Sequence, residues 1–136
     1  MPLDARTVQV GQELPPLDKG AITRDMLKEY GPAAGDPNPM HVDEEFAKNA
    51  GYPGVFAHGM LSMGLTGRLL TDWLGDGVLR EFGVRFVRQV WPGDTLTAKG
   101  TVTSIGPDGR VAIELVTTNQ RGEPVVAGDA VAVLPA

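Results

Sequence analysis

The chain has 136 residues, a formal net charge of −5 and no cysteine, with 42% hydrophobic and 21% charged residues. This composition is typical of one ordinary folded domain over residues 1–136, which can bury a core without disulfides. The negative charge argues against non-specific nucleic-acid binding, which depends on concentrated Lys and Arg. No signal peptide and no apolar run of roughly 18 residues is visible. We therefore expect a cytoplasmic protein without a nucleic-acid or membrane partner.

The first 22 residues are expected to lead into the domain through short extended pieces. Residues 7–10 alternate polar and apolar side chains, and two prolines at positions 15–16 then interrupt any regular element. A first helix is predicted over residues 24–30, because Thr23 is a good N-cap and the apolar residues share one helical face. The Gly-Pro pair at positions 31–32 ends that helix or bends it.

A rigid loop and a short helix follow. Residues 35–39 read Gly-Asp-Pro-Asn-Pro, and two prolines in five residues leave few backbone conformations. Residues 43–48 carry acidic side chains first, as the helix dipole favours, and are predicted to form a short helix. After a loop over residues 51–57, a longer helix is predicted from residues 58–59 to about residue 74. It is apolar on nearly every face and should therefore be buried.

The remaining sequence has the character of strands. Stretches rich in Val, Thr and Phe are separated by turn sequences at residues 91–94, 106–109 and 120–123. The predicted strands are residues 81–90, 94–105, 111–119 and 124–134. Helices followed by an antiparallel meander indicate an α+β fold. The expected architecture is a strongly curved antiparallel sheet wrapped around the long buried helix.

Two residues in the double-proline loop are the strongest candidates for catalysis. His41 follows Asp36 by five residues, so an imidazole and a carboxylate can converge on one water molecule. Each residue alone is better explained as a turn aspartate or a satisfied histidine. Together, in a braced loop, they indicate an acid/base pair. Asn38 between them is expected to stiffen the loop, and no metal site is expected.

The start of the long helix is a second candidate site. Unpaired N–H groups and the helix dipole can hold an oxyanion or a carbonyl oxygen there. The N–H of Gly59 is the natural donor, because no side chain blocks the approach of a ligand oxygen. A plain loop-to-helix junction is the alternative interpretation. His58, at the same junction, is expected to have a structural or supporting role.

Residues 30–64 resemble the MaoC-like dehydratase and R-specific enoyl-CoA hydratase family. The resemblance rests on Ala-Gly-Asp-Pro-Asn-Pro-Met-His at residues 34–41, then Asp43, then Ala-His-Gly-Met at residues 57–60. It implies a hot-dog fold and a hydratase/dehydratase that interconverts trans-2-enoyl and (R)-3-hydroxyacyl thioesters by syn addition or loss of water. It also implies that Asp36 and His41 hold and polarise the water, while the Gly59 N–H binds the thioester carbonyl.

One position departs from the family pattern. Some members carry a serine hydroxyl nine residues beyond the histidine of the His-Gly motif, where this chain has Gly67. Thr66 stands beside it and Ser62 lies one turn earlier. We expect the hydrogen bond supplied there in relatives to be missing, and the glycine to leave room for a longer or branched acyl chain.

The resemblance implies CoA or an acyl carrier protein as the carrier of the acyl group, and no other cofactor. Both carriers present phosphate near a pantetheine arm, so basic side chains should line the entrance. Arg85 and Arg88 are the candidates on the first predicted strand, with Arg68 and Lys99 as further ones. Solvated surface side chains are an equally good interpretation of each.

Two other functions are compatible with the same fold. A hot-dog acyl-CoA thioesterase generally uses a carboxylate on the central helix, and residues 60–72 offer only Asp72, near the far end. Alternatively, the chain is the catalytic subunit of a heterodimeric 3-hydroxyacyl-ACP dehydratase, since it carries both Asp36 and His41. Hot-dog domains typically pair edge to edge, so we expect a homodimer, and a heterodimer remains open.

Overall fold

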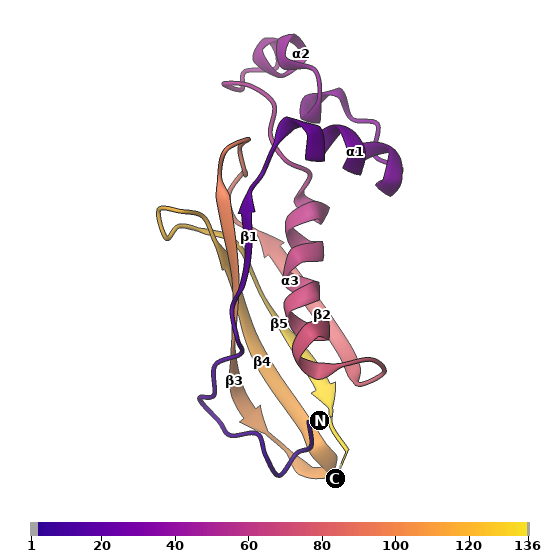
Figure 1. Cartoon of the computed structure of the whole chain (residues 1–136), viewed down its shortest axis with the longest axis vertical. Coiled ribbons are helices and arrows are strands. Elements are labelled where there is room, and N and C mark those ends of the chain that lie inside the picture. The colour runs from indigo at the N-terminus through magenta and orange to yellow at the C-terminus, as the bar shows by residue number, and fades with distance from the viewer. Residues whose placement is uncertain (1–2, 136) are drawn as a thin grey trace.

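The computed structural model describes residues 3–135 and shows an antiparallel sheet of five strands packed against one long helix (Figure 1). In chain order the elements are β1 (Leu17–Ala21), α1 (Arg24–Ala34), the 3₁₀ turn η1 (Pro39–His41), α2 (Glu44–Asn49), α3 (Gly59–Leu74), β2 (Leu79–Phe86), β3 (Thr95–Ile105), the 3₁₀ turn η2 (Pro107–Gly109), β4 (Arg110–Thr118) and β5 (Pro124–Val133). The predicted α+β class and hot-dog arrangement are confirmed.

The spatial order of the strands is β1-β3-β4-β5-β2, so β1 and β2 form the two edges. Burial alternates along β3 and β4, as on Leu96, Ala98 and Val102 of β3. This alternation turns one face of the sheet toward α3. Figure 1 shows α1 and α2 together at one end of the sheet, above the start of α3, with both termini at the opposite end.

The central helix is buried on one side only. Leu65, Leu69 and Leu70 face the sheet and are buried. The prediction of a helix buried on nearly every face is therefore wrong for a single chain. Met60 is 54% exposed, and Gly64 is exposed on the same outer side. The physical reason is that the sheet of one chain covers only one side of the helix. No helix in the described part of the chain is long and apolar enough to cross a bilayer.

Near the N-terminus the structure differs in detail from the expected elements. Residues 7–10 form no strand, and the first strand, β1, instead follows the two prolines at positions 15–16. Of the two alternatives expected at residues 31–32, an end or a bend of helix α1, the end is excluded. The helix continues to Ala34, because Pro32 lies in an exposed last turn that tolerates the loss of one hydrogen bond. The helix ends at Gly35, whose φ of 71° lies in the left-handed region that favours glycine.

The end of β2 differs from the predicted strand over residues 81–90 in a way that shapes the site. β2 ends at Phe86, because the N–H groups of Val87 and Arg88 both donate to the carbonyl of Val125, at 2.9 and 3.4 Å. The segment then leaves the sheet, and the carbonyl of Val90 accepts the N–H of Ala57 at 2.7 Å. This path brings residues 86–90 beside the loop that leads into α3.

Candidate active site

Short polar contacts fix the loop that carries Asp36. Its backbone N–H donates to the carbonyl of Gly31 at 2.9 Å, and its Oδ1 accepts the N–H of Asn38 at 3.2 Å. The side chain of Asn38 in turn accepts the N–H of Met40 at 3.1 Å and caps η1. These contacts agree with the predicted role of Asn38 in stiffening the loop. The turn η1 then ends at His41 and holds that residue close to Asp36.

One short contact sets the orientation of His41, which is only 7% exposed. Its Nδ1 lies 2.6 Å from the backbone oxygen of Phe56. Because a carbonyl only accepts, Nδ1 carries the proton of the neutral ring, and Nε2 keeps a free lone pair. Nε2 lies 3.9 Å from Oδ2 of Asp36. That distance exceeds a direct hydrogen bond, so both atoms can contact the same water molecule.

The ring of His58 packs against the imidazole of His41. The two ring centres are 3.9 Å apart, and Tyr30 meets the ring of His58 edge-on at 4.9 Å. His58 is 2% exposed, and neither of its ring nitrogens has a hydrogen-bond partner among residues 3–135. Burial lowers the pKa of His58 below its usual value, and charge on His41 lowers it further, while Asp36 acts in the opposite direction. The geometry fits a neutral, supporting histidine.

The buried position of His58 predicts a pH-dependent stability. Since its pKa is lower in the folded chain than the unfolded value of about 6.5, acid protonates the unfolded chain first. Protonation of His58 therefore costs the folded chain nothing above about pH 6.5, and the free energy of unfolding decreases as the pH falls from there toward the folded pKa. In urea unfolding between pH 8 and pH 5, the native chain should therefore lose stability relative to His58→Phe, which keeps a stacked ring. Equal pH slopes for the two proteins would contradict this role.

The spacing of these groups also bears on metal binding. Ligand atoms of Asp36, His41 and His58 all lie within 4.8 Å of one another, which by itself would allow a metal ion. Two imidazoles on a tetrahedral zinc, with Zn–N bonds of about 2.0–2.1 Å, place their ring centres roughly 5 Å apart. The ring centres here are closer, at 3.9 Å, so the two rings would have to move apart to bind one zinc ion in this way. The arrangement fits acid/base chemistry better than metal chemistry.

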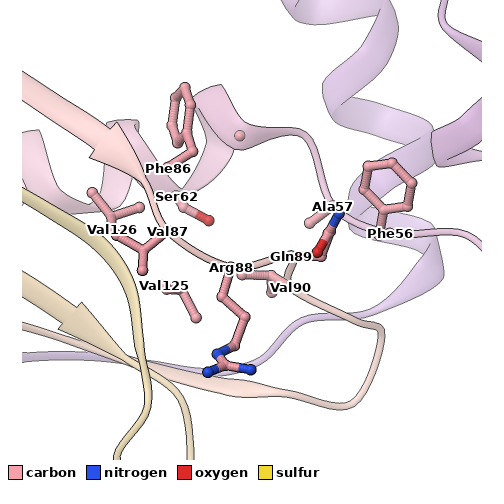
Figure 2. A pocket seen from close by; sticks show the side chains of 11 residues that line it. Phe56, Ala57, Ser62, Phe86, Val87, Arg88, Gln89, Val90, Val125 and Val126 are labelled. Atoms are coloured by element: carbon pink, nitrogen blue, oxygen red, sulfur yellow. The ribbon is translucent and has the colours of Figure 1, made fainter.

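Helix α3 begins at Gly59, and its first turn faces a pocket of about 270 Å³ (Figure 2). Most of the lining is apolar; the polar residues in it are Ser62, Arg88 and Gln89. No side chain caps α3, although side chains cap α1, η1 and α2. The N–H of Leu61 donates to the carbonyl of His58 at 3.1 Å, and the N–H groups of Gly59 and Met60 are left for a ligand. A Cβ at Gly59 would stand 3.2 Å from the ring of Phe86, so glycine fits this contact best.

Asp36 does not line the pocket beside Gly59. Asp36 borders a second pocket of about 660 Å³, which Pro32, Pro37 and Val42 also line. His41 lies between Asp36 and a residue of the first pocket, because its ring contacts the backbone oxygen of Phe56, which lines that pocket. In a single chain the site is thus two open halves rather than one enclosed cavity.

The candidate carrier-binding residues are not all brought together. Arg88 lines the pocket beside Gly59 and pairs with Glu123 at 3.4 Å. Arg85 lies elsewhere, in a hollow of the sheet that it shares with Glu114 and Asp129. Arg68 lies in a groove with Tyr30 on the outer side of α3, and Lys99 is exposed on β3.

Arg121 is a basic residue that the sequence reasoning missed. It shares Glu123 with Arg88, at 2.6 Å from the glutamate oxygen. Its turn sequence gave no sign that residues 120–123 fold back beside residue 88, so only the structure reveals this cationic pair.

The room expected at Gly67 is occupied. A Cβ there would lie 3.2 Å from the ring of Phe82, which extends from β2. The expectation that this glycine opens space for a longer or branched acyl chain is therefore wrong, because an aromatic ring fills the space. The neighbouring Thr66 is buried and turns its hydroxyl inward, toward Thr117 at 2.6 Å.

A hot-dog domain with an Asp/His pair beside an uncapped helix start defines a class of protein suited to acid/base chemistry on a carbonyl compound. Within that class, the chain belongs to the MaoC like domain family, whose family model matches residues 6–132. The family expected from the sequence is confirmed.

Curated relatives support this assignment. The chain is 35% identical over 103 residues to the (R)-specific enoyl-CoA hydratase of Rhodospirillum rubrum. The aligned region covers 74% of this chain and 72% of that protein. It is 36% identical over 95 residues to the enoyl-CoA hydratase ChsH3 of Mycobacterium tuberculosis, and this aligned region covers 68% of this chain. The chain spans only 32% of ChsH3, and 5% of another relative, the fatty acid synthase subunit beta of Saccharomyces cerevisiae.

Solved structures share the fold over nearly the whole chain. The R-hydratase PhaJ1 from Pseudomonas aeruginosa superposes with a TM-score of 0.87 at 30% identity, covering 97% of this chain and 85% of that one. The ChsH1-ChsH2 complex from Mycobacterium tuberculosis gives 0.82 at 27% identity, covering 94% and 98%.

Proposed function

We propose that this chain is an enoyl-thioester hydratase/dehydratase, a lyase that interconverts trans-2-enoyl and (R)-3-hydroxyacyl thioesters. The observation that carries the proposal is the 3.9 Å approach of His41 Nε2 to Asp36 Oδ2, with the imidazole held in one tautomer by Phe56. The (R)-specific enoyl-CoA hydratase among the relatives supports the substrate class and the stereochemistry.

In the hydration direction, a water molecule held between Asp36 and His41 attacks C3 of the enoyl thioester. The pair takes up one proton from the water and delivers one proton to C2 on the same face, which gives syn addition. The electron pair of the C2–C3 double bond shifts toward the thioester oxygen, where the Gly59 N–H and the helix dipole stabilise the developing charge. Dehydration follows the same steps in reverse. Two side chains activate the water, so the proposal needs no cofactor besides the CoA or acyl-carrier thioester.

The proposal includes pairing of two subunits along β2. The outer edge of β2 has no strand partner within the described chain. Phe86 and Val87 are exposed at its end, where the ring of Phe86 lies against Gly59 at the start of α3. An unpaired edge with exposed apolar residues is a liability for a monomer, and a second copy would cover it. A related but different subunit is the alternative partner, since the ChsH1-ChsH2 structure is a complex of two chains.

The decisive experiment is an assay of the purified chain with crotonyl-CoA. We expect loss of absorbance of the conjugated thioester, formation of the (R)-3-hydroxy product and no release of free thiol. Free thiol without the hydroxy product would favour a thioesterase instead. That alternative is weakened by Asp72, which is exposed and paired with Arg68 at 3.5 Å. Sedimentation of the same sample should give twice 14.4 kDa for the active species. A chain that is inactive until a related subunit is added would indicate a heterodimer.

A further inference from the structure

Ser62 supplies the only side-chain hydroxyl in the lining of the pocket beside Gly59. The residue is 3% exposed, and Figure 2 shows its hydroxyl pointing from α3 toward the segment that carries Val87 and Arg88. Within residues 3–135 the Ser62 hydroxyl makes no hydrogen bond to another side chain or to the backbone, whereas the Ser62 carbonyl accepts the hydroxyl of Thr66 at 2.9 Å. Because the hydroxyl faces the pocket, an acceptor atom of a ligand bound there can accept its hydrogen bond.

The hydroxyl of Thr66, one helical turn later, does have hydrogen-bond partners within the protein. Thr66 donates to the carbonyl of Ser62 at 2.9 Å and also contacts the hydroxyl of Thr117 at 2.6 Å. Bonding to the carbonyl four residues earlier is the usual solution for a hydroxyl within a helix. Thr66 is satisfied by the protein in this way, whereas Ser62 faces the cavity unpaired.

The position of Ser62 places its hydroxyl near the uncapped start of α3. Residues three apart share a helix face, and helical side chains lean toward the N-terminus. The hydroxyl of Ser62 therefore leans over the first turn, where the Gly59 N–H is free of any side-chain cap. Arg88, the cationic residue of the same lining, is already paired with Glu123.

We infer that Ser62 is a catalytic hydrogen-bond donor to the thioester carbonyl, acting beside the N–H of Gly59. The inference rests on the proposed function and adds a second donor to its electrophilic site. When water adds to C3, the charge on the thioester oxygen is shared by the Gly59 N–H and the Ser62 O–H. Ser62 keeps its proton throughout, because the proton balance between water and C2 belongs to Asp36 and His41.

Ser62→Ala tests the inference through the kinetics. We expect kcat for crotonyl-CoA hydration to fall by about 10²-fold with KM nearly unchanged, because the donor acts on charge that develops in the transition state. Ser62→Thr keeps a hydroxyl and should recover part of the activity. The matched control is Thr66→Val, which removes a buried hydroxyl from the same helix outside this pocket and should leave kcat unchanged.

A spectroscopic measurement tests the same contact without turnover. Butyryl-CoA has no double bond to hydrate, and a ¹³C label at its thioester carbonyl reports on hydrogen bonds to the oxygen. The infrared stretch of the bound carbonyl should move to higher frequency in Ser62→Ala than in the native chain. An unchanged frequency, an unchanged kcat or a rise in KM alone would overturn the role of Ser62 and leave the proposed function standing. A native chain that hydrates no enoyl thioester would remove the proposed function itself.

Discussion

Asp36→Asn should lower kcat for enoyl-thioester hydration by about 10²- to 10⁴-fold, the range of general acid/base catalysis, in a protein that remains folded. The amide has the shape of the carboxylate, and its oxygen can still accept the N–H of Asn38 that fixes the loop. Its nitrogen only donates, so it cannot take a proton from water opposite Nε2 of His41. Absorbance of crotonyl-CoA gives the rate, and thermal unfolding verifies that the fold is intact.

The matched control for this change is Asp43→Asn. Asp43 lies in the same part of the chain and caps α2 by accepting the N–H of Phe46 at 3.0 Å. Asparagine caps helices about as well as aspartate, so both stability and kcat should change little. Equal losses in the two variants would mean that the negative charge of the loop matters in general. Full activity of Asp36→Asn would contradict the acid/base pair directly.

Elements with strong local signals were predictable from the sequence. The central helix was expected from residues 58–59 to about residue 74 and is Gly59–Leu74, because a long apolar stretch after a Gly-containing loop has few alternatives. The edge strand β1 was missed, since its partner is β3 and Leu17 pairs with Ala98 far along the chain. The exposure of the outer side of α3 was missed for a similar reason: the helix sequence does not say how far one sheet reaches around it.

The candidate site likewise has a part that the local sequence predicts and a part that depends on contacts between distant residues. Asp36 and His41 are five residues apart in a braced loop, so their approach is a local property. The partners that tune them are distant in sequence. Phe56 orients His41 from 15 residues away. The ring of Phe86 packs on Gly59 from another element, so no spacing rule links the two. The unpaired hydroxyl of Ser62 likewise becomes visible only when the pocket around it is formed.

His41→Ala should lower kcat by a factor similar to that of Asp36→Asn, because the water between the two side chains loses its second contact. The cavity left beside His58 and Phe56 provides an internal test, since the His41 ring stacks on His58. Imidazole added to the solution can occupy that cavity and should restore part of the rate. Rescue would show that the missing group is a proton acceptor. A variant that is inactive, unfolded and not rescued would instead assign His41 to packing.

The double variant Asp36→Asn/His41→Ala decides whether the two residues act as one unit. If both act on the same water, removing either abolishes its activation, and the double variant should be little slower than the slower single one. If they act on separate steps, the losses should multiply, so that two factors of about 10³ would give about 10⁶. The 3.9 Å between Nε2 and Oδ2, bridged by one water, favours the first outcome. Multiplied losses would refute a shared water and require two separately bound reacting groups.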